Sequence, residues 1–206
     1  MEPLRSHTGR CLPLRRSNVD TDQIIPSEYC RSVRRTGYAD ALFARWRTDP
    51  DFVLEQPERA GATVLLAGAH FATGSSREHA VWALRDWGVA AVIAPSFGDI
   101  FCRNALKNGL LAVALPDRAV ASLLERAERD AAFETTLDLV ECRVSAGEQS
   151  WAFDIDARAR RLLLAGHDDI TATLTRQDAI ARHERTRPHW LPALTPGSAL
   201  FPTEQS

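Results

Sequence analysis

Three short apolar runs in the middle of the chain limit most strongly what it can fold into. They cover residues 62–67, 89–94 and 110–115, and each has the length of a buried β-strand. Helical patterns over residues 78–87 and 97–107 separate them. Continuous apolar strands that alternate with helices indicate parallel strands that are covered on a face by those helices. The sequence therefore predicts an α/β fold.

The periodicity changes in the C-terminal half of the chain. After an amphipathic helix that follows Pro116, apolar and polar residues alternate between Leu137 and Ile155. A turn at Gly147 within this alternating stretch predicts a β-hairpin. The phase of the alternation flips near Leu139, which favours a β-bulge at that point.

Helical patterns return over residues 157–165 and 175–185, and a proline-rich stretch without clear periodicity follows. Such a stretch is typical of a chain end that is disordered or lies on a partner. We therefore expect one domain over residues 1–186 and an extended or disordered tail over residues 187–206.

The composition excludes several classes of protein. The 206 residues include 25 basic and 27 acidic ones, so the net charge is −2 and no basic face for nucleic acid is predicted. Lys107 is the only lysine, which excludes a P-loop and any mechanism that needs a lysine elsewhere. With 45% hydrophobic residues the chain can bury a sizeable core.

The four cysteines indicate a reduced environment. They are widely and irregularly spaced without a C-x-x-C motif, a pattern that suits neither a disulfide framework nor a zinc or iron–sulfur site. The N-terminal residues lack the apolar stretch of a signal peptide, and no apolar run is long enough to span a membrane. We expect a soluble, cytoplasmic protein with no membrane partner and no metal bound by this chain.

The segment over residues 70–79 is the most informative for function. It connects a predicted buried strand to a predicted helix, and ligands bind at this edge of open α/β sheets. Ser75 and Ser76 bring two hydroxyls, Arg77 can bind a carboxylate through two parallel hydrogen bonds, and the helix N-terminus attracts anions. Ser75 with Glu78 also matches a capping box, which needs no ligand and is the simpler interpretation of this segment alone.

Two further segments carry polar side chains of interest. Asp20 and Asp22 can orient a substrate hydroxyl or hold an arginine, although a local Asx-type turn is the stronger interpretation of that segment alone. Residues 31–37 form a basic loop that suits an anionic substrate or is simply solvated surface. The histidines show no metal-binding spacing, and neither G-x-S-x-G nor G-x-G-x-x-G occurs.

Taken together and in this order, the polar segments resemble a known family. Residues 18–26 (NVDTDQIIP) followed by residues 74–80 (GSSREHA) are similar to the small subunits of 3-isopropylmalate dehydratase, which correspond to the swivelling domain of the aconitase superfamily. The resemblance continues through residues 82–84, 92–97, 99–101 and 178–180. It covers most of the chain and implies a swivelling β/β/α fold, here with a C-terminal helical extension.

The resemblance also implies a reaction and a partner. Enzymes of this family isomerise 2-isopropylmalate to 3-isopropylmalate in leucine biosynthesis, by removing water and adding it back at the neighbouring carbon. The implied [4Fe–4S] cluster belongs to a large subunit, so this chain is expected to bind no cofactor itself and to be inactive alone. The expected substrate is a small dicarboxylate.

The same resemblance assigns roles to single residues. Ser75 matches the serine that acts as the base and takes a proton from the carbon beside a carboxylate. A serine hydroxyl is a weak base, and the positive potential of Arg77 and of the helix N-terminus would stabilise its alkoxide. The residues that match substrate-binding positions are Asp22, Ser76, Arg77, Arg35 and Thr36.

One triplet departs from the family pattern. Members usually have Gly-Cys-Gly before the two serines, whereas this chain has Ala72, Thr73 and Gly74. Alanine is strained at the first position if that position needs a positive φ. The departure leaves two alternatives open: a related hydro-lyase subunit that acts on another 2-substituted malate, and a non-catalytic carboxylate-binding module on the same fold.

Overall fold

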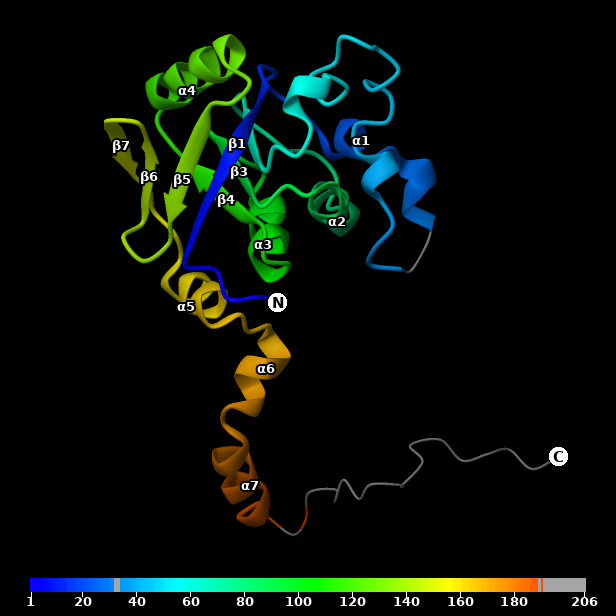
Figure 1. Ribbon diagram of the computed structural model, residues 1–206. Helices are drawn as coiled ribbons and strands as arrows, with labels where there is room; N and C mark the ends of the chain where they lie inside the picture. Colours follow the sequence, from blue (N-terminus) through cyan, green and yellow to red (C-terminus); the bar gives the residue numbers. More distant parts are fainter. Residues whose placement is uncertain (32–33, 189, 191–206) are drawn as a thin grey trace, which may run out of the picture. The chain divides into compact units, whose positions relative to one another are not determined.

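A mixed β-sheet organises the N-terminal part of the chain (Figure 1). Its strands are β1 (Ser6–Leu14), β2 (Val64–Ala67), β3 (Ala91–Ala94), β4 (Leu111–Ala114), β5 (Glu134–Asp138), β6 (Arg143–Ala146) and β7 (Gln149–Ala152). The structure, a computed structural model, describes residues 1–31, 34–188 and 190, and within them the strand order is β4-β3-β2-β1-β5-β6-β7. Because β1 runs parallel to β2 and antiparallel to β5, it joins a parallel half of the sheet to an antiparallel half.

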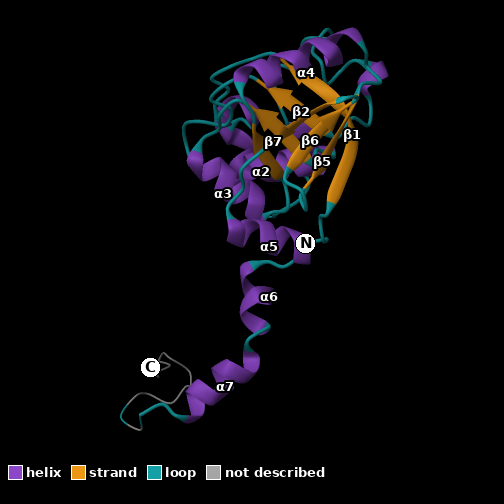
Figure 2. Ribbon diagram, turned by 90° about the vertical axis from the view of Figure 1, so that its left-hand side faces the viewer, coloured by secondary structure: helices purple, strands orange, loops and turns teal. Residues whose placement is uncertain are grey.

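The helices of the same compact unit are α1 (Thr21–Ile24), α2 (Glu78–Trp87), α3 (Asp99–Lys107), α4 (Asp117–Arg129) and α5 (Ala157–Ala165). Two further helices follow along the chain, α6 (Asp169–Leu174) and α7 (Gln177–Arg185). Figures 1 and 2 show α4 on one side of the sheet and α2 with α3 on the other. The α/β fold predicted from the three apolar runs is therefore confirmed.

The two faces have separate hydrophobic cores, which explains why the parallel strands are apolar throughout. Along β2, Leu65 and Ala67 belong to the core that contains the α2 side chains, while Val64 and Leu66 belong to the core that contains the α4 side chains. Successive side chains of a strand point to opposite faces, so a strand that is covered on both sides needs an apolar residue at every position.

The antiparallel half corrects one prediction. The expected hairpin around Gly147 is confirmed as the pairing of β6 with β7. The bulge predicted near Leu139 is wrong, because the chain reverses there in a tight turn between β5 and β6. Asp138 stabilises this turn, since its Oδ1 accepts the backbone N–H groups of Val140 at 2.7 Å and Glu141 at 2.8 Å. The flip in phase therefore marks two different strands.

The predicted helix boundaries are confirmed for α2 and α5. Each ends at a glycine in the left-handed conformation, Gly88 with a φ of 107° and Gly166 with a φ of 66°. The helix predicted over residues 97–107 is α3, which begins two residues later, at Asp99. The helix α6 was not predicted, because six residues are too few for a periodic signal.

The chain divides into two compact units, residues 1–169 and the residues from Ile170 onward. The sequence placed a boundary at residue 187 instead, and the single domain over residues 1–186 stays a prediction. Of the predicted tail over residues 187–206, residues 189 and 191–206 lie outside the described residues. The described helices include none that is long and apolar enough to cross a membrane.

Backbone hydrogen bonds tie together the loops at the carboxyl ends of the parallel strands. In the loop after β2, the N–H of Phe71 donates to the carbonyl of Ser96 at 3.0 Å, and its carbonyl accepts from Gly98 at 2.9 Å. On its other side, Thr73 exchanges two hydrogen bonds, at 3.3 and 3.1 Å, with the segment that enters α1. The loop after β2 is thus held between the segments that follow β1 and β3.

This close approach depends on Gly98, and we predict that Gly98→Ala lowers the free energy of unfolding by about 1–3 kcal/mol. A Cβ at this position would lie 2.4 Å from the backbone oxygen of Ala72, so the loop would have to move. Chemical denaturation of the isolated chain measures the effect. Arg103→Ala, on the exposed side of α3, is the control and should change stability by no more than about 0.5 kcal/mol. Equal denaturation midpoints for Gly98→Ala and the wild type would contradict the tight crossing.

Candidate functional site

A pocket of about 300 Å³ lies where the loop after β2 meets the N-terminus of α3. Ser75, Ser76 and Arg77 give it a polar wall, and Ile100 and Phe101 give it an apolar one. The sequence predicted the polar wall, because it follows a buried strand. The structure therefore brings Ser75, Ser76 and Arg77 to one cavity at the carboxyl edge of the sheet, where open α/β sheets bind ligands.

The two serine hydroxyls are free to contact a ligand. Both serines are exposed, and neither side chain forms a hydrogen bond to any described residue. The helix α2 begins at Glu78 with Arg77 as its N-cap residue, and no side chain caps it. The capping-box interpretation of Ser75 and Glu78 is therefore wrong, and the structure removes the simplest reason for a serine at this position that does not involve a ligand.

Several backbone N–H groups of the same loop have no acceptor among the described residues. His70, Ala72 and Gly74 have positive φ angles of 59°, 57° and 88°, with ordinary residues between them. Within the described part of the chain, the N–H groups of Ala72, Gly74, Ser75 and Ser76 have no hydrogen-bond acceptor. Together with the positive end of α2, they favour a carboxylate in the pocket.

Arg77 is held by an aspartate and keeps part of its guanidinium available. Its Nη1 donates to Oδ1 of Asp22 at 2.6 Å and to the carbonyl of Ile25 at 3.2 Å, while its Nη2 has no partner among the described residues. The second carboxylate oxygen of Asp22 accepts from Nη1 of Arg45 at 2.9 Å. Of the two roles predicted for Asp22, the structure shows that of holding an arginine.

The charge of Asp22 is secured by these contacts. The hydrogen bond from Arg77, the backbone N–H of Ser27 and the charge of Arg45 hold the pKa of the Asp22 carboxyl below its ordinary value. Asp20 has the local role that the sequence suggested, because its Oδ1 accepts the N–H of Gln23 at 2.8 Å in a capping box at the start of α1. The capping box of this region is thus at Asp20.

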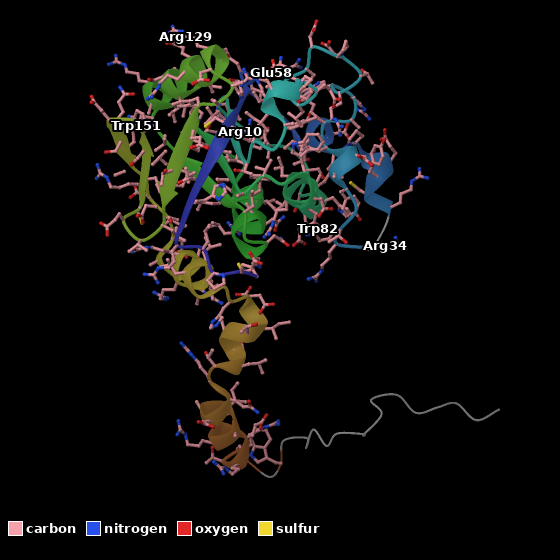
Figure 3. The ribbon with its side chains drawn as sticks, in the orientation of Figure 1. Arg10, Arg34, Glu58, Trp82, Arg129 and Trp151 are labelled. Atoms are coloured by element: carbon pink, nitrogen blue, oxygen red, sulfur yellow. The ribbon has the colours of Figure 1, made fainter. Side chains whose placement is uncertain are left out.

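The basic loop lies outside the pocket in this structure. Arg35 and Thr36 are exposed and are not among the residues that line the cavity. The backbone N–H groups of the next two residues donate to Oδ2 of Asp86 at 2.6 and 2.8 Å, which fixes this end of the loop to α2. Figure 3 shows the side chain of Arg34, on the same loop, at the right-hand side of the view. A substrate contact of Arg35 and Thr36 stays a prediction.

Sequence reasoning missed the half of the pocket that α3 contributes. Ile100, Phe101 and Asn104 line it, together with Asp99 in the first turn of the helix. The sequence could have indicated this wall, because the predicted strand over residues 89–94 is followed by this helix. The carboxyl ends of neighbouring parallel strands lie at one edge of a sheet, so the start of this helix is expected near the loop after β2. Phe101 also packs edge-to-face on Phe71 at 5.6 Å, which makes the apolar wall continuous with the core.

The cysteines do not fit a [4Fe–4S] cluster. Burial raises the pKa of the Cys11 and Cys102 thiols to about 11 and also raises that of Cys30, so none of the three is activated as a thiolate. No three His, Cys, Asp or Glu side chains among the described residues converge as metal ligands.

Two comparisons identify the class of the protein. A family model described as the aconitase C-terminal domain matches residues 1–118. The crystal structure of a 3-isopropylmalate dehydratase from Methanocaldococcus jannaschii superposes with a TM-score of 0.63 and 27% sequence identity, over 86% of this chain and 99% of that one. The fold is that of the aconitase C-terminal domain, which confirms the class of fold that the sequence motifs implied.

Sequence relatives define the family more narrowly. The 3-isopropylmalate dehydratase small subunit of Acidothermus cellulolyticus is 57% identical over 192 residues, which are 93% of this chain and 98% of the relative. The subunit of the same name from Thermobifida fusca is 54% identical over the same shares of both chains. The chain belongs to the family of 3-isopropylmalate dehydratase small subunits, which confirms the resemblance seen in its motifs.

The departure at Ala72 leads to a stability prediction. Ala72 has a φ of 57°, a left-handed conformation that costs a residue with a Cβ about 1–2 kcal/mol. We predict that Ala72→Gly changes the free energy of unfolding by no more than about 0.5 kcal/mol, because relief of this conformation offsets the extra chain entropy of glycine and the lost burial of the alanine methyl group. The matched control is Ala121→Gly inside α4, which should lower it by about 1 kcal/mol. Chemical denaturation measures both, and two losses of similar size would contradict the strained conformation.

Proposed function

We propose that the pocket is the part of a 3-isopropylmalate dehydratase active site that the small subunit supplies. The chain is a subunit of this hydro-lyase, which converts 2-isopropylmalate to 3-isopropylmalate by dehydration and rehydration in leucine biosynthesis. The observation that carries the assignment of the site is the convergence of two free hydroxyls and a partly free guanidinium, from Ser75, Ser76 and Arg77, on one cavity.

The two walls of the pocket suit the two chemical features of the substrate. Isopropylmalate carries carboxylates and a branched alkyl group. Arg77, Ser76 and the free N–H groups of the loop offer donors to a carboxylate, and charge-assisted bonds of this kind are the strong ones. Ile100 and Phe101 offer an apolar surface to the alkyl group.

Ser75 is proposed to move the proton. The alkoxide of Ser75 takes a proton from the carbon next to the one that carries the hydroxyl, the hydroxyl leaves as hydroxide and a carbon–carbon double bond forms. For rehydration the Ser75 hydroxyl returns a proton to the carbon that lost the hydroxyl, hydroxide adds at its neighbour and the Ser75 alkoxide is restored. The guanidinium of Arg77 and the positive end of α2 stabilise the alkoxide, which in water would be too basic to persist.

The rest of the active site is proposed to lie on a large subunit. The described residues offer no ligand set for the [4Fe–4S] cluster, which supplies Lewis acidity toward the departing hydroxyl when bound, so we assign it to that partner. Ser75 and Ser76 are exposed, and the partner would exclude water from them. We further propose that the complex is cytoplasmic and that its substrate is a small dicarboxylate.

We predict that Ser75→Ala lowers kcat by about 10²–10⁴-fold, because the proton loses its acceptor. The chain is mixed anaerobically with an intact large subunit, and turnover of 2-isopropylmalate is measured at saturating partner. Ser122→Ala, on a half-buried position of α4, is the matched control and should retain full activity. Unchanged turnover of Ser75→Ala would contradict the assignment of the base. A wild-type complex that turns over only another 2-substituted malate would favour the related hydro-lyase instead.

We predict that Arg77→Lys lowers kcat/KM by about 10–100-fold. A lysine ammonium is a point charge, and it cannot pair with Asp22 while presenting a second planar donor to a carboxylate. Steady-state kinetics of the reconstituted complex measure the loss, and the partner affinity of the variant is determined alongside. A variant with wild-type kcat/KM would show that the guanidinium does not contact the substrate.

A further inference from the structure

Arg45, which belongs to none of the sequence motifs, shares the carboxylate of Asp22 with Arg77. Nη1 of Arg45 donates to Oδ2 of Asp22 at 2.9 Å, and its Nη2 lies 3.5 Å from a carboxylate oxygen of Glu28. The Arg77 side chain is 21% exposed and that of Arg45 is 55% exposed. The aspartate thus connects a surface arginine to the arginine in the pocket wall.

The backbone beneath Arg45 is fixed although its side chain is exposed. Phe43, which is fully buried, donates its N–H to the carbonyl of Ile24 in α1 at 2.7 Å. Trp46 stacks on the Phe43 ring at 5.3 Å. Arg45 lies between these two aromatic anchors, on a turn bonded to the helix that carries Asp22, so less conformational entropy is lost when the ion pair forms than for a typical surface arginine.

The division of the Asp22 carboxylate between two arginines has a geometric consequence. Each oxygen serves one guanidinium, Oδ1 serving Arg77 and Oδ2 serving Arg45. Asp22 with Arg77 alone has no net charge, whereas the three groups together carry a charge of +1. Glu28, whose side chain is as exposed as that of Arg45, adds a negative charge 3.5 Å from Arg45, so the four groups together have no net charge. The contribution of Arg45 is therefore mainly geometric, because it fixes the plane of the carboxylate that orients Arg77.

We propose that Arg45 is a positioning residue for substrate binding, which acts through Asp22 on the carboxylate-binding guanidinium of Arg77. The inference rests on the proposed function of the pocket and extends it to a residue outside the cavity. Arg77 keeps its charge beside Ser75 when Arg45 is removed, and only the orientation of its guanidinium is relaxed. We therefore expect the loss of Arg45 to act mainly on KM and to change kcat little.

The test uses the enzyme reconstituted with its large subunit at saturating concentration, so that weaker assembly does not appear as a change in KM. Arg45→Gln should raise the KM for 2-isopropylmalate about two- to five-fold, the range that exposed ion pairs produce, with kcat within about two-fold of the wild type. Arg45→Lys, which restores the charge, should recover at least half of the effect on a logarithmic scale. The difference should shrink as ionic strength rises.

Arg15→Gln is the matched control. Arg15 pairs with Glu128 at 2.7 Å and its side chain is 49% exposed, so this variant loses a similar ion pair on a different part of the surface. It should have wild-type KM and kcat. A KM increase as large as that of Arg45→Gln would mean that the effect reflects overall charge, and would overturn the proposal.

The route through Asp22 is tested by a double-mutant cycle. In an Asp22→Asn background, Arg45→Gln should change KM by less than about 1.5-fold, since the carboxylate that connects the two arginines is gone. A full effect in that background, or an Arg45→Gln enzyme with wild-type KM, overturns the inference. Failure of the proposed function is distinguishable, because the wild-type complex would then have no activity on 2-isopropylmalate.

Discussion

The site depends on the way in which the loop after β2 is held between the segments that follow β1 and β3. Phe71 and Thr73 form backbone hydrogen bonds to opposite sides, and Gly98 lets the backbones approach closely. The N–H groups of Phe71 and Thr73 are taken up by these bonds. Those of Ala72 and Gly74, which alternate with them, have no acceptor among the described residues. The strain at Ala72 follows from the same geometry, because this path of the loop needs a left-handed residue there. The stability of this loop and the proposed anion site thus depend on one arrangement of backbone.

Charged side chains and the dipole of α2 add to the backbone donors of the pocket. Asp22 divides its oxygens between Arg77 and Arg45, so the guanidinium that lines the pocket is held in one orientation. The N-terminus of α2 adds positive potential at the same wall. A negatively charged diacid is therefore matched to one side of the pocket, while Phe101 and Ile100 leave the other side apolar.

Sequence reasoning predicted what depends on local pattern and failed where distant segments meet. The apolar runs predicted the parallel strands, and the serines at a strand end predicted the polar wall. The capping box was placed at Ser75 instead of Asp20, because both positions satisfy the same short pattern and only the start of each helix decides between them. Arg45 lies in a segment without periodicity, and its position follows from aromatic packing that no spacing rule encodes. The positive φ of His70 also has no signal in the sequence.

A structure of the assembled enzyme with a non-reacting analogue of isopropylmalate addresses the chemistry of the pocket most directly. The account predicts one carboxylate of the analogue within hydrogen-bond distance of Arg77 and Ser76, with Oγ of Ser75 beside the carbon that loses its proton. An analogue bound elsewhere in the complex, with no atom of it in contact with these three residues, would contradict it.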